Sequence, residues 1–291
     1  MEIPHTVTAR PDTGLYNAKI GVWLFLASEV MLFGGLFSAY VFLRIGALPG
    51  YWPHGLLNVP VGTFNTLVLI FSSVTVVLAW ASLKMRKFGQ YKLWMGITIL
   101  CGVAFLFIKL TVEWPAKFTH FGAYIKKDAL SKYEPYLGNN YLEAKGLPPR
   151  VEITGDIAPG SENDTNAKAY VFEKIDAIYS DPTNPEMDRP SFWPRAMVEK
   201  KVVVDKADVE YASMFYPRHS SYFSVYFLIT GLHGLHVLGG LIVFTYFWLP
   251  VGANLYKKNP EHLANRIEVV GLFWHFVDLV WIFVFPLFYL L

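Results

Sequence analysis

The sequence predicts an all-α integral membrane protein, a bundle of five transmembrane helices joined to one irregular soluble insertion. Composition is the first observation, because 54% of the 291 residues are hydrophobic and 17% are aromatic, with a mean hydropathy of +0.34. An ordinary soluble domain is less apolar than this. The second observation is a set of five apolar runs, each long enough to cross a hydrocarbon layer that takes about 20 helical residues: 18–43, 61–83, 93–114, 222–249 and 269–291.

Several classes of protein are excluded by the same composition. The net charge is only +2 and the basic residues are not gathered into one patch, which argues against a nucleic-acid partner. Cys101 is the single cysteine, so the chain has no intrachain disulfide and no cysteine-based zinc or iron–sulfur site. The first apolar run is too long for a signal-peptide core. We therefore expect residues 1–17 to be a retained polar lead.

The topology follows from the basic residues in the short connections. Four lie between the second and third runs and three between the fourth and fifth: Lys84, Arg86, Lys87, Lys92, Lys257, Lys258 and Arg266. Connections rich in lysine and arginine stay in the cytoplasm. This predicts a cytoplasmic N-terminus, helices one to three within 18–114, an extracytoplasmic segment at 115–221, and helices four and five within 222–291, with an extracytoplasmic C-terminus.

The segment 115–221 differs in composition from the rest of the chain. It holds 16 of the 23 acidic residues and 14 of the 25 basic ones. We expect a helix over 167–178 and a strand over 201–204, without a strong periodicity. Loops of this length are usually functional or disordered, so the segment is either a solvated loop or a small docking module. No catalytic residue is predicted in it.

The first run contains one carboxylate, Glu29, near its middle, with Ser28 beside it as a hydrogen-bond donor. A polar group in lipid is costly unless it is paired or solvated. Glu29 is therefore either a neutral acid that is hydrogen-bonded to a neighbouring helix or a lipid head group, or a proton carrier. Arg44, at the end of this run, together with Arg218 and His219 before the fourth run, suits the extracytoplasmic interface, either as anchors or as contacts to lipid head groups.

The fourth and fifth runs hold the remaining polar groups of interest. His233 and His236 lie in a glycine-rich stretch of the fourth. In the fifth, spacings of three and four place one polar stripe on one helix face: Glu268, Gly271, His275, Asp278 and Ile282. We predict a polar clamp between helices four and five, with the opposite face of helix five turned to lipid: Phe273, Val277, Val280 and Val284. The alternative is a metal site of His-x-x-His type. In the third run, Lys109 and Glu113 are four apart and suit an ion pair.

Together these stretches resemble subunit III of the haem–copper oxidases, the cytochrome c oxidase subunit III family. The resemblance rests on 25–33, on Asn65-Thr66 followed by Ser72-Ser73, on Phe105 with Glu113-Trp114, on 230–240, and on Glu268 followed by 274–281. It covers all five helices and leaves 115–221 unmatched. Members of the family commonly have seven helices, so this chain resembles the final five. Lys109 stands where the family resemblance leads us to expect glutamine.

The resemblance implies a non-catalytic subunit of a proton-pumping oxidase in the bacterial cell membrane. It implies no redox centre and no metal in this chain, with haem and copper in subunits I and II. Bound phospholipid, a lipid-lined oxygen route and maintenance of proton uptake are the implied roles. Glu29 matches the family's buried glutamate near the lipid cleft. His233, His236, Glu268, His275 and Asp278 match its polar clamp and head-group region.

The resemblance leaves the electron donor open. Residues 115–221 fall on the side where cytochrome c or a membrane donor complex approaches, which favours a cytochrome c oxidase over a quinol oxidase. Two other classes remain as alternatives. One is a proton-coupled transporter with a relay of Glu29, His233, His236 and Asp278. The other is a histidine-rich membrane metalloenzyme.

Overall fold

The computed structural model describes residues 17–47, 57–133, 151–158, 168–176, 197–214 and 221–290. Arg218 and His219 lie outside these ranges. The chain divides into two compact units. One comprises Met1–Ser38, Val61–Lys109 and Leu228–Leu287, and the other comprises Ala39–Pro60, Leu110–Phe227 and Phe288–Leu291.

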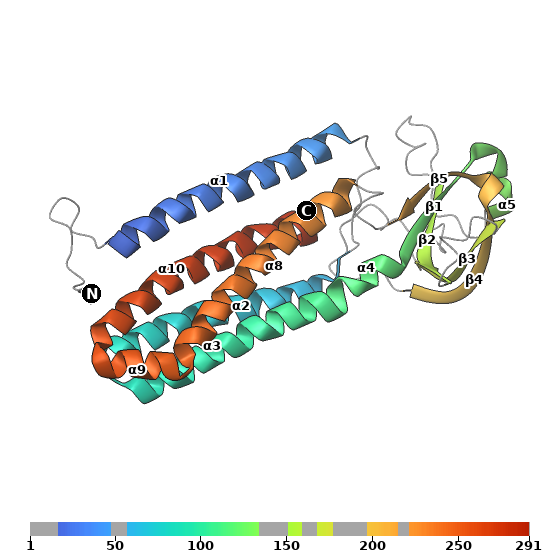
Figure 1. Ribbon diagram of the computed structural model, residues 1–291. Helices are drawn as coiled ribbons and strands as arrows, with labels where there is room; N and C mark the ends of the chain where they lie inside the picture. Colours follow the sequence, from blue (N-terminus) through green and yellow to red (C-terminus); the bar gives the residue numbers. More distant parts are fainter. Residues whose placement is uncertain are drawn as a thin grey trace. The chain divides into compact units, whose positions relative to one another are not determined.

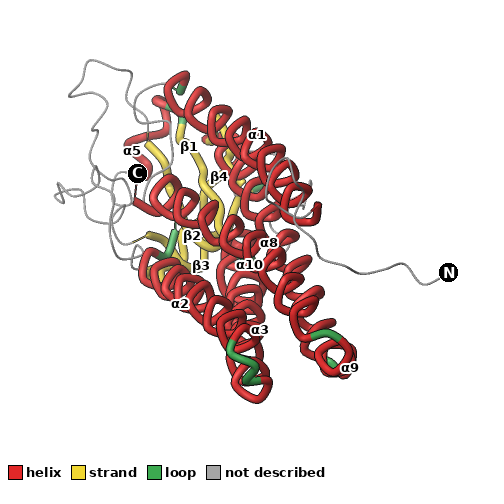
Figure 2. Tube along the Cα trace, turned by 90° about the vertical axis from the view of Figure 1, so that its left-hand side faces the viewer, coloured by secondary structure: helices red, strands yellow, loops and turns green. Residues whose placement is uncertain are grey.

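Five helices are long and apolar enough to cross a membrane, which confirms the predicted spans (Figures 1 and 2). They are α1 (Asn17–Gly46), α2 (Val59–Lys84), α3 (Phe88–Ile108), α8 (Ser221–Trp248) and α10 (Pro260–Phe285). A π-helical turn extends α3 over Lys109–Glu113, and another extends α10 over Pro286–Leu290. A short helix, α9 (Pro250–Lys258), connects α8 to α10.

The two basic connections lie at the same end of the bundle. The Tyr256 hydroxyl of α9 donates to the carbonyl oxygen of Arg86 at 2.9 Å, and the Tyr256 and Phe88 rings are 4.6 Å apart. Lys92 of α3 donates to the carbonyl oxygen of Trp248, whose indole N–H donates back to the carbonyl oxygen of Lys92. The turn between α2 and α3 is therefore fixed against the end of α8 and against α9.

Trp274 is the centre of packing among α3, α8 and α10. Its indole N–H donates to the Ser72 hydroxyl of α2 at 3.0 Å, and its ring lies on two glycines, Gly102 of α3 and Gly240 of α8. A Cβ at Gly240 would lie 2.8 Å from the ring, and one at Gly102 would lie 2.9 Å from it. Small residues let membrane helices approach closely. These two glycines thus let α10 place a fully buried indole between its neighbours.

The structure corrects the predicted lipid face of the last helix. Val277, Val280 and Val284, which were expected to face lipid, are all buried. The physical reason is that α10 packs against several helices at once. Lipid tails are as apolar as a protein core, so apolar side chains do not distinguish the two surroundings.

α1 is attached along a narrow seam. Its three buried residues are Leu26, Phe33 and Tyr40, spaced seven apart, while most of its other residues are exposed to the membrane. A seven-residue repeat keeps one stripe of a helix against its neighbour. Phe33 contacts Phe276 of α10 with ring centroids 6.3 Å apart. A helix attached in this way leaves lipid-facing surface on both sides of its contact.

The described part of the insertion contains a five-stranded antiparallel sheet, whereas the sequence predicted an irregular segment. The strands are β1 (His120–Ile125), β2 (Val151–Ile157), β3 (Ala169–Asp176), β4 (Met197–Asp205) and β5 (Val209–Met214), in the order β4-β3-β2-β1-β5. The edge strands β4 and β5 are joined by only the 3₁₀ turn Lys206–Asp208, so the sheet must curl until its edges meet (Figure 1). The predicted strand at 201–204 is confirmed, and the predicted helix at 167–178 is wrong.

Two short helices flank β1. α4 (Pro115–Thr119) follows α3 after a single turn residue and leads directly into β1, and α5 (Leu130–Tyr133) follows β1. The interior of the curled sheet is formed by nine buried residues: Phe121, Ala123, Ile125, Tyr133, Ile153, Phe172, Ile175, Val202 and Val204. The insertion therefore has an apolar core of its own.

Candidate functional site

The buried glutamate of α1 is paired with a histidine of α8. Oε2 of Glu29 lies 3.0 Å from Nε2 of His236, and both side chains are largely buried. Nδ1 of His236 lies 2.7 Å from the carbonyl oxygen of Leu232. A carbonyl oxygen only accepts, so Nδ1 carries a proton and donates it there. Glu29 and His236 then share the remaining proton between Oε2 and Nε2, which is the chemistry of a proton-holding pair.

Ser28, expected as a donor to Glu29, has a different role. Its hydroxyl donates to the carbonyl oxygen of Phe25 within α1 at 2.7 Å. Such local bonds are common for serine in helices and satisfy the hydroxyl without a partner helix. The partner of Glu29 comes from α8 instead, and the rings of Phe33 and Phe273 lie 5.5 and 6.1 Å from the His236 ring.

Glu268 is the α10 end of an ion pair with α1. Nζ of Lys19 lies 2.5 Å from Oε1 of Glu268, and both side chains are partly buried. Lys19 lies seven residues before Leu26 and so continues the buried stripe of α1. The Lys19–Glu268 contact was not predicted from the sequence. The seven-residue repeat of Lys19, Leu26, Phe33 and Tyr40 is the signal that identifies it.

His275 and Asp278 are joined through a serine of α2. Nδ1 of His275 lies 2.6 Å from the Ser73 hydroxyl, which also hydrogen-bonds to the Asp278 carboxylate. A carboxylate accepts, so the Ser73 hydroxyl donates to Asp278 and accepts from Nδ1–H of His275. In the described part of the chain, no hydrogen bond links either residue to α8. The five residues predicted to form one clamp between α8 and α10 are thus distributed, and the polar contacts of α10 lead to α1 and α2.

His233 lies in the aromatic core between α3 and α10. Its ring is 5.6 Å from the Phe105 ring and 5.0 Å from the Trp281 ring. Both ring nitrogens are buried, and within the described residues neither has a hydrogen-bond partner. The histidine of this motif that faces α1, His236, and the one that faces α10, His233, therefore have different surroundings although they are three residues apart.

Lys109 and Glu113 occupy the π-helical turn at the end of α3. The Lys109 ammonium lies 4.5 Å from the centre of the Trp281 ring, which is a cation–π contact. Glu113 accepts a hydrogen bond from the Tyr289 hydroxyl at 2.7 Å, and its carbonyl oxygen accepts one from Lys117 at 3.1 Å. π-helical turns are frequent at functional sites. The Lys109–Glu113 ion pair itself stays a prediction.

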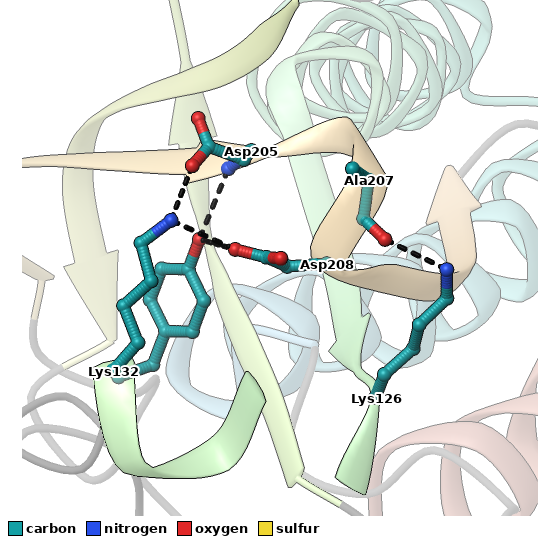
Figure 3. A network of polar contacts seen from close by, with 6 residues as sticks. Lys126, Lys132, Asp205, Ala207 and Asp208 are labelled. Carbon is teal, nitrogen blue, oxygen red and sulfur yellow. Dashed lines mark hydrogen bonds and ion pairs between the residues drawn. The ribbon is translucent and has the colours of Figure 1, made fainter. Parts of the chain in front are cut away.

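A polar network joins α5 to the 3₁₀ turn between β4 and β5 (Figure 3). Lys132 binds both Asp205 and Asp208, and the Tyr133 hydroxyl donates to Asp208 at 2.7 Å and accepts from the Asp205 N–H at 3.1 Å. Lys126 donates to the carbonyl oxygen of Ala207 at 2.7 Å. The hydrogen bond from Lys132, and then that from Tyr133, lower the pKa of Asp208 below its usual 3.8. The network fastens the corner where the sheet closes.

The residues considered for lipid or metal give less information. Arg44 lies half-buried at the last turn of α1, and Arg218 and His219 are not among the described residues. Among the residues that the structure describes, no group of three or more histidine, cysteine, aspartate or glutamate side chains is placed to hold a metal ion.

Comparison with known proteins decides the family. The family model described as cytochrome c oxidase subunit III matches residues 5–124 and 198–291, which is well over half of the chain. The chain belongs to the cytochrome c oxidase subunit III family. The match includes every transmembrane helix, together with β1, β5 and all but the first residue of β4, and it omits β2 and β3. The inserted part of this subunit III is therefore centred on the two middle strands of the sheet.

Relatives of this subunit III come from two types of oxidase. Cytochrome c oxidase subunit 3 of Alkalihalophilus pseudofirmus is 24% identical over 277 residues, which cover 94% of this chain and 87% of that protein. Cytochrome bo(3) ubiquinol oxidase subunit 3 of Pseudomonas aeruginosa is 23% identical over 291 residues, 100% of this chain and 92% of that protein. Probable cytochrome c oxidase subunit 3 of Mycobacterium tuberculosis is 47% identical over 70 residues, 24% of this chain and 33% of that protein.

Membership in this family settles the coarse function. The chain is a multi-pass membrane subunit of a haem–copper terminal oxidase and assembles with other oxidase subunits. Subunits III carry no redox centre of their own. The Glu29–His236 pair and the Lys19–Glu268 ion pair are thus features of a supporting subunit, and both lie on the seam by which α1 is attached.

Proposed function

We propose that this chain is subunit III of a proton-pumping cytochrome c oxidase in the bacterial cell membrane, where it supports subunit I without reacting itself. The observation that carries the proposal is the family match over both membrane segments, 5–124 and 198–291. Its direct partners in this proposal are subunits I and II, which hold the haem and copper. A cytochrome c donor is favoured by the folded insertion.

The proposed orientation has the N-terminus in the cytoplasm and the insertion and C-terminus outside. It is supported by the connections between α2 and α3 and between α8 and α10, which carry the basic residues and lie at one end of the bundle. Basic connections remain on the cytoplasmic side of a bacterial membrane. The partly buried Lys19–Glu268 pair joins the first turns of α1 and α10, which begin at that end.

The proposed support of subunit I involves phospholipid beside α1. This helix buries only Leu26, Phe33 and Tyr40, and the apolar surface left on either side suits acyl chains. Arg44 at its outer end is suited to a phosphate head group. The Glu29–His236 pair lies on the same seam, so lipid beside α1 would border a group that holds a proton. Oxygen access and proton-uptake maintenance are part of this proposal.

The insertion is proposed to dock the electron donor. Support comes from its folded core and from its place in the chain, on the side expected to be extracytoplasmic. Lys200 and Lys201 are adjacent and exposed on the edge strand β4. Charge on such a rim mainly governs the association rate and its dependence on salt. Reversing both charges should therefore change the Michaelis constant for the donor and its salt dependence, with the maximal rate unchanged.

The test of the proposal is purification of the tagged chain from its native membrane in mild detergent. The preparation is examined by its reduced-minus-oxidised haem spectrum and by oxygen uptake with cytochrome c and with quinol. Haem bands with cytochrome c oxidation support the proposal. Activity with quinol alone would select the second candidate, a quinol oxidase, which relatives such as the Pseudomonas aeruginosa subunit favour. A preparation without haem partners would overturn the oxidase assignment and return attention to a proton-coupled transporter.

A further inference from the structure

Four helices each contribute one buried polar residue to a single level of the bundle. They are Asn65 of α2, Lys109 of α3, His233 of α8 and Asp278 of α10, with exposed fractions of 0, 4, 1 and 5%. Buried polar residues inside a membrane segment are rare and usually functional. A layer built from all four helices therefore requires an account separate from the seam of α1.

Trp281 of α10 marks this level. Its ring centre lies 4.5 Å from the Lys109 ammonium and 5.0 Å from the His233 ring. Its indole N–H donates to the Thr66 hydroxyl at 2.9 Å, and Thr66 is the neighbour of Asn65 in the chain. Asp278 lies three residues before Trp281, which is one helical turn. The four polar residues are thus all placed within about a turn of one indole ring.

Five polar atoms of this layer are buried and lack a hydrogen-bond partner among the described residues. They are both amide atoms of Asn65, both ring nitrogens of His233, and Oδ1 of Asp278. Nearly all buried polar atoms in folded proteins are hydrogen-bonded, because an unsatisfied one keeps the full cost of its desolvation. Five such atoms at one level indicate that a bound molecule supplies their partners.

The chemistry of the five atoms identifies that molecule. The Asn65 amide has one donor and one acceptor, a neutral imidazole has one of each, and a carboxylate oxygen accepts. An anion would satisfy only the donors, and a metal ion would satisfy only the acceptors. Water does both, and a buried water typically takes about three hydrogen bonds to such groups.

We propose that Asn65, His233 and Asp278 bind a cluster of water molecules inside the core of α2, α3, α8 and α10. The water dipoles would also solvate the Lys109 ammonium, which otherwise faces only the Trp281 ring among the contacts described above. This hydrated layer is independent of the electron donor and of lipid binding.

A hydrogen-bonded chain connects the layer to the side of the bundle. His275 is only half-buried, and its Nδ1 contacts the Ser73 hydroxyl, which in turn binds Asp278. Asp278 therefore has one oxygen in this chain and Oδ1 in the layer. The geometry points to His275 as the place where water or a proton enters the layer from the surface of α2 and α10.

X-ray hydroxyl-radical footprinting of the intact oxidase tests this proposal, because radicals formed from bound water label adjacent side chains even where bulk solvent is excluded. Trp281 and Trp274 are a matched pair. Both are fully buried on α10, and both donate their indole N–H to a hydroxyl of α2. We expect Trp281 to be oxidised several-fold faster than Trp274, with incorporation of ¹⁸O from labelled water.

The variant Asn65→Leu removes two of the five polar atoms with little change in volume. It should lower the oxidation of Trp281 towards that of Trp274 and leave Trp274 unchanged. Equal and slow oxidation of the two tryptophans in the unaltered oxidase would overturn the proposal, and this comparison holds even if the variant does not assemble. A persistent Trp281 excess in an assembled Asn65→Leu oxidase would also overturn it.

Discussion

The adjacent glycines Gly239 and Gly240 of α8 offer a controlled test of how closely α10 packs. A Cβ at Gly240 would lie 2.8 and 3.0 Å from two atoms of the Trp274 ring, whereas a Cβ at Gly239 would have no atom within 4 Å. Gly240→Ala and Gly239→Ala are the same chemical change at neighbouring positions of one helix. The difference between them therefore isolates the contact with Trp274.

The magnitude follows from the displacement that the alanine requires. The ring must move by about 0.6 Å, from 2.8 Å to the 3.4 Å at which ordinary contact begins. Its hydrogen bond to Ser72 and the fit over Gly102 oppose this movement. Overpacking of a close-packed core costs about 1–3 kcal/mol. The gain in helix propensity from glycine to alanine, about 1 kcal/mol, applies to both variants and cancels.

We therefore expect Gly240→Ala to be less stable than Gly239→Ala by about 1–3 kcal/mol in the free energy of unfolding. Unfolding in mixed micelles of increasing denaturing detergent, followed by circular dichroism, measures this difference. In the background Trp274→Phe, the smaller ring should remove most of it, which gives a double-mutant cycle. Equal stability of the two alanine variants would refute the packing argument, as would a difference that Trp274→Phe leaves unchanged.

Three further predictions concern the polar contacts. Glu29→Gln should leave assembly intact, because glutamine is nearly isosteric with a protonated glutamate and still donates to Nε2 of His236, while Glu29→Leu should lower the melting temperature of the complex; the reverse order would contradict the shared-proton geometry. Tyr133→Phe should destabilise the sheet by about 1–2 kcal/mol, since both hydrogen bonds of the hydroxyl are lost, and faster hydrogen exchange in β4 and β5 measures it. Because the pKa of Asp208 is lowered on folding, its contribution is complete above its usual 3.8 and is lost as pH falls through the folded value, so protection of β5 should decline below about pH 4 and Lys132→Met should flatten that decline; an unchanged pH profile would refute the role of this network.

The transmembrane helices were predictable because each span records its environment in length and apolarity alone. The sheet was not, and β3 shows why. Phe172 and Ile175 are three residues apart, a helical spacing, yet both enter the sheet core. The register between β2 and β3 shifts so that Glu173 is an extra residue on β3, which turns the strand's period of two into a spacing of three. A bulge of this kind imitates a helical pattern and explains the wrong prediction.

The candidate site was predictable in its members and not in its pairings. Buried polar residues stand out in an apolar sequence, which identified Glu29, His233, His236 and Asp278. Their partners depend on which helices meet and at which height, and Glu29 and His236 are 207 positions apart. No local spacing carries that information. Ser73 was assigned only a general role between helices, and its position between His275 and Asp278 required the structure.

The polar contacts of α1 have a physical role beyond their own energy. Apolar contacts in a membrane have little preference for one register, because a leucine that leaves a helix partner finds an equally apolar lipid. α1 is held by a stripe of three buried residues, a seam that could slip by one turn of about 5.4 Å at small apolar cost. Such a slip would separate both Glu29 from His236 and Lys19 from Glu268, and would leave a carboxylate and an ammonium in lipid. The two polar pairs, ten residues apart on α1, therefore fix its height against α8 and α10. A single pair would leave α1 free to pivot, and the second pair fixes its tilt as well.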